Sequence, residues 1–477
     1  MASYVRAKKE VDMLNGPLLG RLIRFSIPLI LSGILQLLYN AADIIIVGQF
    51  EGVNAVGAVG ATTSLNALFT NLAISISAGT SMCLSAQLGA KNRRAAFEYV
   101  HTAIITALVL GVGIGSIGFF LSRTMLVWTN TDAAILSDAT LYLKICFCGM
   151  PANLLYNYAA AIIRNNGDTK SPLIYLSISG LLNVGLNILL VAAFHMGVAG
   201  VAVATVSSQA LSALLCLFHL HRLPKEHPCH LFFNKIRFYN NKFIQMLKAG
   251  IPIALNGLAF SIANVTIYSN VNAFGVAATA GSAASSSVEG FTYIAMNAVG
   301  QATLIFVGQN RGAENWERVK RVVSISSILV VITGVVMAVV TFLFREPLLL
   351  AYLGEEGDAL SFGVSRMICV LLPYFLCGLM EVFVSGSRGM GYSFWPMVIT
   401  VSSVFGFRML WIALALPPLY ALIPDPFAQF RLLFLAFPIS WLIACLPQCL
   451  YFSFVYRRTK KALSKELAEQ KSSLSNF

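Results

Sequence analysis

Three acidic side chains lie deep inside long apolar stretches of the chain, namely Asp43, Glu289 and Glu381. A carboxylate at the centre of a bilayer costs about 2.5–3.5 kcal/mol on insertion scales, so such groups are rare and usually functional. We therefore expect Asp43 to face a cavity or an ion path. Two interpretations stay open for Glu289 and Glu381. Either they bind a substrate or a second ion, or they satisfy an interhelical hydrogen bond, with Arg408 as one available partner.

Asp43 has the richest polar surroundings of the three. Tyr39 precedes it by four residues, so the two side chains share one face of a helix. Asn183 and Asn187 share a helix face in the same way. If these two faces meet, their oxygens form a site for a cation, or surround a carboxyl that the low dielectric keeps partly protonated. The alternative is that Asn183 and Asn187 only hydrogen-bond one helix to another.

These side chains need a scaffold, and the composition indicates one inside a membrane. Of the 477 residues, 57% are hydrophobic and 11% are charged, with a mean hydropathy of +0.75. A soluble domain carries roughly 25% charged residues. Apolar runs that are long enough to cross a bilayer as helices recur along the sequence. They predict twelve transmembrane helices near 22–48, 57–87, 97–122, 134–163, 171–194, 197–220, 243–274, 279–309, 321–344, 359–388, 394–417 and 431–456.

The basic residues predict how these helices are oriented. The net charge of +13 would suggest a nucleic acid partner if the protein were soluble. Most of the 33 Lys and Arg residues instead lie on the side of the predicted membrane that holds both termini. The positive-inside rule therefore predicts a multi-pass protein of the cell membrane with both termini in the cytoplasm. It also accounts for the charge without nucleic acid.

The sequence repeats itself about 224 residues apart. Ile27-Pro28 recurs as Ile251-Pro252, and Arg164-x-x-Gly167 recurs as Arg388-x-x-Gly391. Each half holds six predicted helices, an even number, so both halves enter the membrane from the same side as a parallel repeat. The predicted organisation is a cytoplasmic segment 1–21, an N-terminal six-helix lobe 22–220, a cytoplasmic inter-lobe loop 221–242, a C-terminal six-helix lobe 243–456 and a cytoplasmic tail 457–477.

The repeat also shows that the polar residues of the first half are missing from the second. Position 43 corresponds to Ile267, while positions 183 and 187 correspond to Phe407 and Trp411. A polar cluster in only one of two related halves indicates that ion coupling belongs to the first half.

Several other kinds of site are disfavoured. Five His and Cys residues near the inter-lobe loop lack a complete tetrahedral ligand pattern, so we expect a solvated loop and no metal site; they are His219, His221, His227, Cys229 and His230. The chain has no P-loop sequence and no nucleophile elbow. We therefore expect no catalytic residues, no enzyme activity and no cofactor.

Several motifs resemble those of the multidrug and toxic compound extrusion (MATE) family. In the first half these are Tyr39-Asn-x-x-Asp43, Ala86-Gln-x-Gly-Ala-Lys-Asn92 and Arg164-x-x-Gly-Asp-Thr-Lys-x-Pro172. In the second half they are Gly308-Gln-Asn-x-Gly-Ala313 and Arg388-Gly-x-Gly391. The matches follow the order of the family from about residue 16 to residue 456.

The resemblance implies a two-lobed antiporter that exports organic cations or other xenobiotics in exchange for H⁺ or Na⁺. It implies that Asp43 is a coupling residue, with Asn183 and Asn187 as the polar pair of helix 5 and Tyr39 and Tyr142 nearby. Some members also carry acids on helices 7 and 10. In this chain, helix 7 has none.

Three other functions, a flippase, an intramembrane enzyme and a passive channel, predict different sequence features. A flippase for lipids or lipid-linked saccharides, with a related two-lobed architecture, often has 14 helices and a large cationic cavity. Twelve predicted spans and few basic residues within them weigh against it. An intramembrane enzyme needs paired catalytic groups, and a passive channel does not explain lone buried acids. The expected partners are a small-molecule substrate and membrane lipid.

Overall fold

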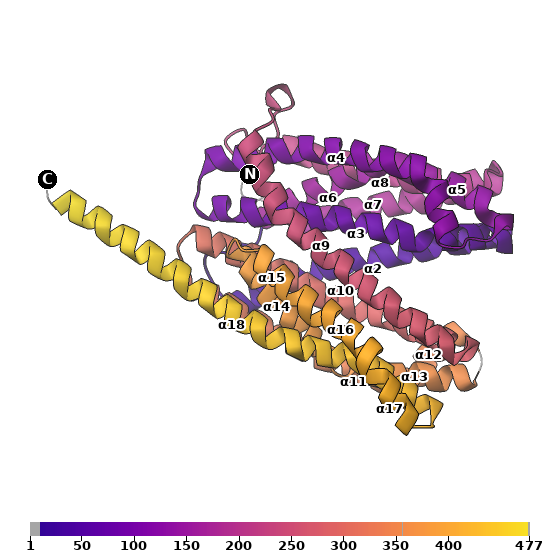
Figure 1. Cartoon of the computed structure of the whole chain (residues 1–477). Helices are drawn as coiled ribbons and strands as arrows, with labels where there is room; N and C mark the ends of the chain where they lie inside the picture. Colours follow the sequence, from indigo (N-terminus) through magenta and orange to yellow (C-terminus); the bar gives the residue numbers. More distant parts are fainter. Residues whose placement is uncertain (1–9, 355, 476–477) are drawn as a thin grey trace. The chain divides into compact units, whose positions relative to one another are not determined.

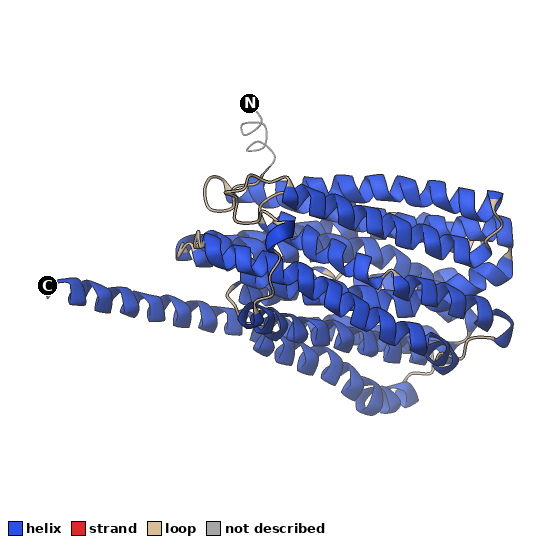
Figure 2. Ribbon diagram, turned by 90° about the horizontal axis from the view of Figure 1, so that it is seen from above, coloured by secondary structure: helices blue, strands red, loops and turns tan. Residues whose placement is uncertain are grey.

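The computed structural model describes residues 10–354 and 356–475, and within these the chain is helical without a strand (Figure 2). The predicted cytoplasmic segments 1–21 and 457–477 therefore lie partly outside the described residues. Ten helices are long and apolar enough to cross a membrane, and two bent helix pairs raise the total to twelve. This confirms the all-helical architecture of twelve spans. The ten continuous spans are α2 (Leu18–Glu51), α3 (Val53–Gly89), α4 (Arg93–Trp128), α7 with η1 (Lys170–Asn187 and Ile188–Ala193), α8 (Gly197–His221), α9 with η3 (Asn240–Val271 and Asn272–Phe274), α10 (Val276–Gly312), α11 (Trp316–Leu343), the run from α15 to α17 (Phe394–Leu422) and α18 (Pro426–Ser475).

The two bent pairs occupy equivalent places in the sequence repeat. In the first, α5 (Ala133–Cys148) and α6 (Met150–Asn165) meet at an angle of 45°. In the second, α13 (Asp358–Leu371) and α14 (Phe375–Gly389) meet at 40°. Proline lacks a backbone N–H and clashes with the preceding turn, so it bends a helix where neighbouring groups allow. Pro151 and Pro373, at or just after the two breaks, provide that cause.

The fifth and eleventh spans share another irregularity. The π-helix η1 ends the fifth span, and the eleventh holds the π-helices η4 (Val401–Gly406) and η5 (Trp411–Ala415) on either side of the short α16 (Phe407–Leu410). π-Helical turns are rare and occur frequently at functional sites. The eleventh span begins with α15 (Phe394–Thr400) and ends with α17 (Leu416–Leu422).

The chain divides into two compact units. Unit 1 comprises Met1–Met13 and Ile23–Ala254, and unit 2 comprises Leu14–Leu22 and Leu255–Phe477. Helices α3 to α8 belong wholly to unit 1 and helices α10 to α18 to unit 2 (Figure 1). The helices α2 and α9, which begin the two sequence repeats, each contribute residues to both units. One short helix that the sequence did not predict, α12 (Arg345–Leu353), follows α11 in unit 2.

Unit 1 holds its helices together through close backbone contacts at small residues. A Cβ atom at Gly79 would lie 2.6 Å from the carbonyl oxygen of Met246, so α3 and the start of α9 approach backbone to backbone. A Cβ at Gly115 would lie 2.6 Å from the carbonyl oxygen of Phe147, which brings α4 equally close to α5. Small residues allow such approaches between membrane helices, where packing replaces the hydrophobic effect as the source of association.

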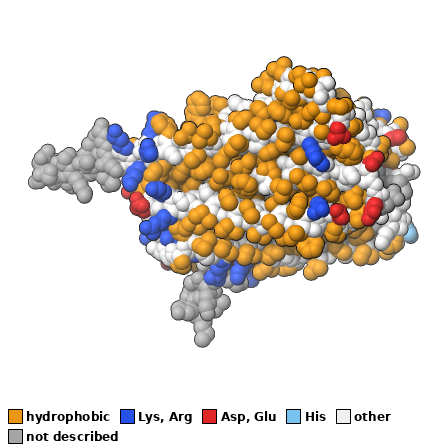
Figure 3. All heavy atoms as spheres, turned by 90° about the horizontal axis from the view of Figure 1, so that it is seen from below, with side chains coloured by type: hydrophobic (Ala, Val, Ile, Leu, Met, Phe, Trp, Pro, Cys, Tyr) orange, Lys and Arg blue, Asp and Glu red, His pale blue; other side chains and the backbone are white. Residues whose placement is uncertain are grey.

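The surface is that of a membrane protein. Large apolar side chains are widely exposed on the spans, among them Phe120 (79% exposed) and Leu181 (78%). Figure 3 shows one mostly hydrophobic face, with the charged side chains gathered towards its ends. Soluble monomers rarely expose contiguous apolar patches this large, whereas a lipid bilayer covers them.

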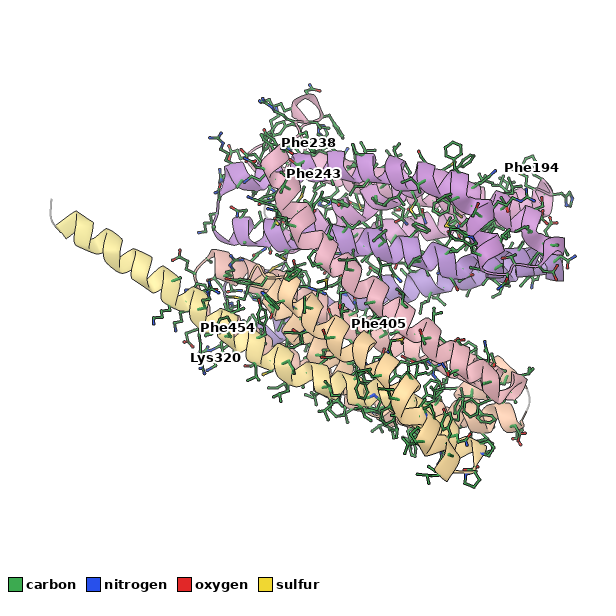
Figure 4. All side chains as sticks on the ribbon, in the orientation of Figure 1. Phe194, Phe238, Phe243, Lys320, Phe405 and Phe454 are labelled. Atoms are coloured by element: carbon green, nitrogen blue, oxygen red, sulfur yellow. The ribbon has the colours of Figure 1, made fainter. Side chains whose placement is uncertain are left out.

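The segment between α8 and α9 packs against unit 1 instead of forming the solvated loop that we expected. Cys229 is fully buried and His230 is 4% exposed. The backbone N–H of Phe232 donates to Nε2 of His101, and the rings of Phe238 and Phe243 pack 5.1 Å apart at the start of α9 (Figure 4). Burial raises the pKa of the Cys229 thiol to about 12. Among the described residues, no group of three or more His, Cys, Asp or Glu side chains is placed to hold a metal ion.

Candidate functional site

A ring of hydrogen bonds surrounds the carboxylate of Asp43. Asn187 Nδ2 donates to Asp43 Oδ1 over 2.5 Å, and the Thr205 hydroxyl donates to Oδ2 over 3.0 Å. Asn187 Nδ2 also lies 3.3 Å from Asn183 Oδ1, and Asn183 Nδ2 lies 3.4 Å from the Thr205 hydroxyl oxygen. The four side chains therefore close a ring that joins α2, α7 and α8. We call these four residues the Asp43 ring.

The local helix geometry explains how the ring forms. Asn183 and Asn187 are one turn apart on α7, so their amides stack along the same face and bond to each other. Both are buried, at 3% and 0% exposure, as is Asp43 at 5%. Because an unsatisfied polar group inside a membrane costs several kcal/mol, these groups bond to one another.

The Asp43 carboxylate has hydrogen-bond donors but no cationic partner. Among the described residues, no Lys, Arg or His lies within salt-bridge distance of it, and its partners are the neutral groups of the ring. Asn187 Oδ1 is buried and makes no hydrogen bond with any described residue. A buried carboxylate without a counter-charge, next to a free amide oxygen, has the chemistry to take up a proton or a small cation.

Thr205 is the member of the ring that the sequence analysis missed. It lies on α8 among several other hydroxyl residues, including Ser207, Ser208 and Ser212. Hydroxyls in membrane helices commonly bond to a carbonyl of their own helix, as Ser208 and Ser212 do here. Nothing in the spacing distinguishes Thr205 from them. Its role depends on the distance between α8 and α2, which only the fold determines.

The two predicted tyrosines take different places near the ring. The Tyr39 hydroxyl donates to the carbonyl oxygen of Leu176 over 2.9 Å, and a Cβ atom at Gly180 would overlap the Tyr39 ring. Tyr39 therefore packs α2 against α7 and does not bond to Asp43. Tyr142, on α5, is buried, and its phenol lies close enough to Asp43 to interact with it electrostatically.

Glu289 in unit 2 is paired with an arginine. Arg366 Nη2 lies 2.7 Å from Glu289 Oε2 and also donates to the Tyr268 hydroxyl oxygen over 2.9 Å. The other terminal nitrogen of Arg366 donates to the backbone oxygen and the hydroxyl of Ser282. Arg408, which we considered as a partner for one of the acids, donates instead to Asn264 Oδ1, and its Nε donates to a serine hydroxyl on α18.

Glu381 is paired in the same manner. Arg388 Nη1 lies 3.3 Å from Glu381 Oε1, which also accepts a hydrogen bond from the Ser385 hydroxyl. All three groups lie on α14, within two turns of one another. Each carboxylate of unit 2 that the sequence singled out thus has its own guanidinium.

The positions of unit 2 that correspond to the Asp43 ring are apolar or bonded elsewhere. Ile267 is fully buried. The ring of Phe407 packs 5.7 Å from that of Trp411, whose indole N–H donates to the carbonyl oxygen of Leu432. The two units therefore share the repeated backbone architecture, whereas the polar ring occurs in unit 1 and its counterpart positions in unit 2 lack it.

Comparison with known proteins agrees with this architecture. The sequence profile of the MatE family matches residues 28–189 and again residues 252–413, one match in each half. The "Probable multidrug resistance protein YoeA" of Bacillus subtilis is 26% identical over 442 residues, covering 91% of this chain and 93% of that protein. A second protein of that organism, the "Probable multidrug resistance protein YpnP", is 27% identical and covers 84% of this chain and 89% of its own length.

The fold itself matches a solved structure. The structure titled "Crystal structure of MATE in the bent conformation" superposes with a TM-score of 0.83 at 18% identity, over 94% of this chain and 98% of the other. Together, the profile match in both halves, the twelve spans and this superposition show that the chain belongs to the MATE (MatE) family of membrane transporters.

Proposed function

We propose that this protein is a secondary active antiporter that exports organic cations or other xenobiotics across the cell membrane in exchange for H⁺ or Na⁺. The observation that carries the proposal is the Asp43 ring, in which a buried carboxylate has neutral donors and no counter-charge. The relatives named as multidrug resistance proteins supply the substrate class. Asn183, Asn187 and Thr205 complete the coupling site, with Tyr142 close to it and Tyr39 positioning α2.

Ion binding changes what the ring can bond to. With Asp43 ionised, both carboxylate oxygens accept, one from Asn187 and one from Thr205. A proton on either oxygen makes that oxygen a donor, so the hydrogen bonds of the ring must rearrange around it. A cation such as Na⁺ prefers oxygen ligands, which Asp43, Thr205 and the amide oxygen of Asn187 offer once that amide rotates.

Transport follows if the two states of the ring favour different arrangements of the helices. The ring joins α2 to α7 and α8, so a change in its hydrogen bonds alters how α2 packs. A ligand shifts such an equilibrium only through its different affinity for the two states. In the proposed cycle the substrate enters from the cytoplasm, with both termini on that side, and an ion that binds Asp43 from outside favours the state that releases it.

The test is efflux of a fluorescent organic cation from proteoliposomes with the Na⁺ and pH gradients imposed separately. One gradient should drive efflux in the unchanged protein, and Asp43→Asn should reduce that efflux to the level of protein-free liposomes while the protein still inserts. Efflux that persists in Asp43→Asn would remove Asp43 from the coupling site. Absence of efflux under either gradient would favour the flippase function over the antiporter.

A further inference from the structure

The chain between α8 and α9 exposes large apolar side chains although it belongs to neither span. All six residues at 233–238 have exposed side chains. Three of them are large and apolar, namely Phe233 (49% exposed), Ile236 (38%) and Phe238 (44%). Single exposed apolar side chains are normal on a protein surface, whereas a group of them indicates an interaction site. We call residues 233–238 the apolar-basic segment, because it also contains Lys235 and Arg237.

The residues on either side of the apolar-basic segment are hydrogen-bonded to α4. The backbone N–H of Phe232 donates to Nε2 of His101 over 3.2 Å. The backbone N–H of Tyr239 donates to the Thr102 hydroxyl oxygen over 3.2 Å. Both contacts lie within unit 1. The backbone is thus held at both ends of the segment, and the side chains between them face away from α4.

These two contacts place the segment at the depth where lipid headgroups meet the acyl chains. His101 follows Arg93, the first residue of α4, by eight positions, which is a rise of about 12 Å along the helix axis. The apolar stretch of α4 begins near residue 97, so the segment lies beside the first turns of the span and not beyond its end. Aromatic rings and long basic side chains are both favoured at this level of a bilayer.

The charge of this region is complementary to an anionic surface. Between the end of α8 and the start of α9, the chain carries four basic residues and one acid, Glu226. Neither Lys235 nor Arg237 forms an ion pair with any described residue, whereas Lys242 lies 3.6 Å from a carboxylate oxygen of Glu98. Unpaired cations next to exposed apolar side chains are typical of surfaces that bind anionic lipid, where electrostatic attraction and apolar burial act together.

We propose that the apolar-basic segment is a docking surface for anionic phospholipid. Lys235 and Arg237 contact the lipid phosphate groups, while the three apolar side chains insert among the upper parts of the acyl chains. Because no residue of the segment belongs to the Asp43 ring, the inference does not depend on the coupling ion or on the transported compound. Salt should weaken the attraction, since exposed charges are screened over about 8 Å at physiological ionic strength.

Hydrogen–deuterium exchange of the full-length protein in lipid nanodiscs tests the inference. One set of discs contains phosphatidylcholine alone, and the other also contains phosphatidylglycerol with the same acyl chains. We expect amide exchange at 233–238 to be roughly three- to tenfold slower with phosphatidylglycerol, because the covered backbone is less accessible to water. The phosphatidylglycerol content that gives half of this slowing should rise roughly fivefold for each charge removed in Lys235→Gln and Arg237→Gln.

Two further double variants make the test specific. Arg93→Gln with Lys170→Gln removes two exposed basic side chains of unit 1 outside the segment, and the slowing at 233–238 should persist. Phe233→Ser with Phe238→Ser keeps both cations of the segment but should lose most of the slowing, which a site for a free phosphate ion would not.

Three results would overturn the inference. The first is exchange at 233–238 that is equally fast in the two kinds of disc. The second is an equal loss of slowing in the Arg93→Gln, Lys170→Gln control and in Lys235→Gln with Arg237→Gln. The third is exchange that is equally slow in both kinds of disc and in detergent, which would show that protein, and not lipid, covers the segment.

Discussion

The two units have related backbones but differ in the partners of their buried carboxylates. In unit 1, Asp43 is held by Asn187 and Thr205 and has no cationic partner among the described residues. In unit 2, Glu289 and Glu381 are each bonded to an arginine. Both units contain a bent helix pair and π-helical turns at equivalent places.

This difference separates a chemical function from a structural one. An arginine next to a carboxylate compensates its charge and bonds to it, which leaves no unpaired charge for an ion to neutralise. A carboxylate among neutral donors is less well compensated and gains from binding a proton or a cation. We therefore propose that ion coupling belongs to unit 1, whereas the two paired acids of unit 2 hold helices together.

The largest expected effect comes from removing an arginine in unit 2. Arg366→Met leaves the Glu289 carboxyl without its partner, and breaking a buried ion pair in this way costs about 3–5 kcal/mol of stability. The free energy of unfolding, or the midpoint of thermal unfolding in detergent, measures the loss. The double variant Arg366→Met with Glu289→Met should recover most of it. Asp43→Asn, in contrast, should leave the stability unchanged or higher. Equal losses of stability in Arg366→Met and Asp43→Asn would contradict the comparison.

A second substitution sharpens the comparison by showing which ion unit 1 uses. Thr205→Val keeps the shape but removes a hydrogen bond to a carboxylate, which is worth about 1.5–3 kcal/mol, or roughly tenfold or more in affinity. If H⁺ is the coupling ion, Asp43 loses a donor that favours its charged form, and half-maximal efflux moves to higher pH. If Na⁺ is the coupling ion, a ligand is lost and half-maximal efflux needs more Na⁺. No change in either dependence would exclude Thr205 from the site.

A smaller effect is expected from the contact that positions α2 in unit 1. A side chain at 180 overlaps the Tyr39 ring, so Gly180→Ala should cost about 1–3 kcal/mol through overpacking. The cost should appear as slower efflux with the ion dependence retained, because the Asp43 ring itself is untouched. Gly180→Ala combined with Tyr39→Ala should restore the rate in the same assay. Full activity of Gly180→Ala alone would show that this packing does not matter for transport.

The smallest effect is expected at the position of unit 2 that corresponds to Asp43. Ile267→Val removes one buried methyl group and should cost about 0.5–1.5 kcal/mol of stability. The pH and Na⁺ dependence of efflux should not change, since unit 2 has no ring at this place. A shifted ion dependence in Ile267→Val would contradict the assignment of coupling to unit 1 alone.

The sequence predicts most of the fold because the membrane restricts the chain so strongly. Every span must be a helix of sufficient length, and apolar runs show directly where these lie. Proline alone does not locate the bends, because Pro151 and Pro373 lie at the two bent pairs whereas Pro28 and Pro252 lie inside unbroken helices. The helix α12 was missed because its nine residues are too short for a span and include Arg345 and Glu346.

The site was less accessible to sequence analysis. Helical spacing pairs Tyr39 with Asp43 and Asn183 with Asn187, and the structure brings three of these four into one ring. Spacing does not tell which helices are neighbours, so Thr205 was overlooked. The same limitation hid the partners of Glu289 and Glu381, since Arg366 lies 77 residues from Glu289 along the chain.

The central claim, that Asp43 is where the coupling ion acts, is tested most directly by following the ion itself. Proteoliposomes loaded with a pH-sensitive or Na⁺-sensitive dye report ion movement when a substrate gradient is applied. We predict that the unchanged protein and Glu289→Gln move one of the two ions against the substrate, and that Asp43→Asn moves neither. Continued substrate-driven ion movement in Asp43→Asn, or its loss in Glu289→Gln with Asp43 intact and the protein folded, would contradict the account.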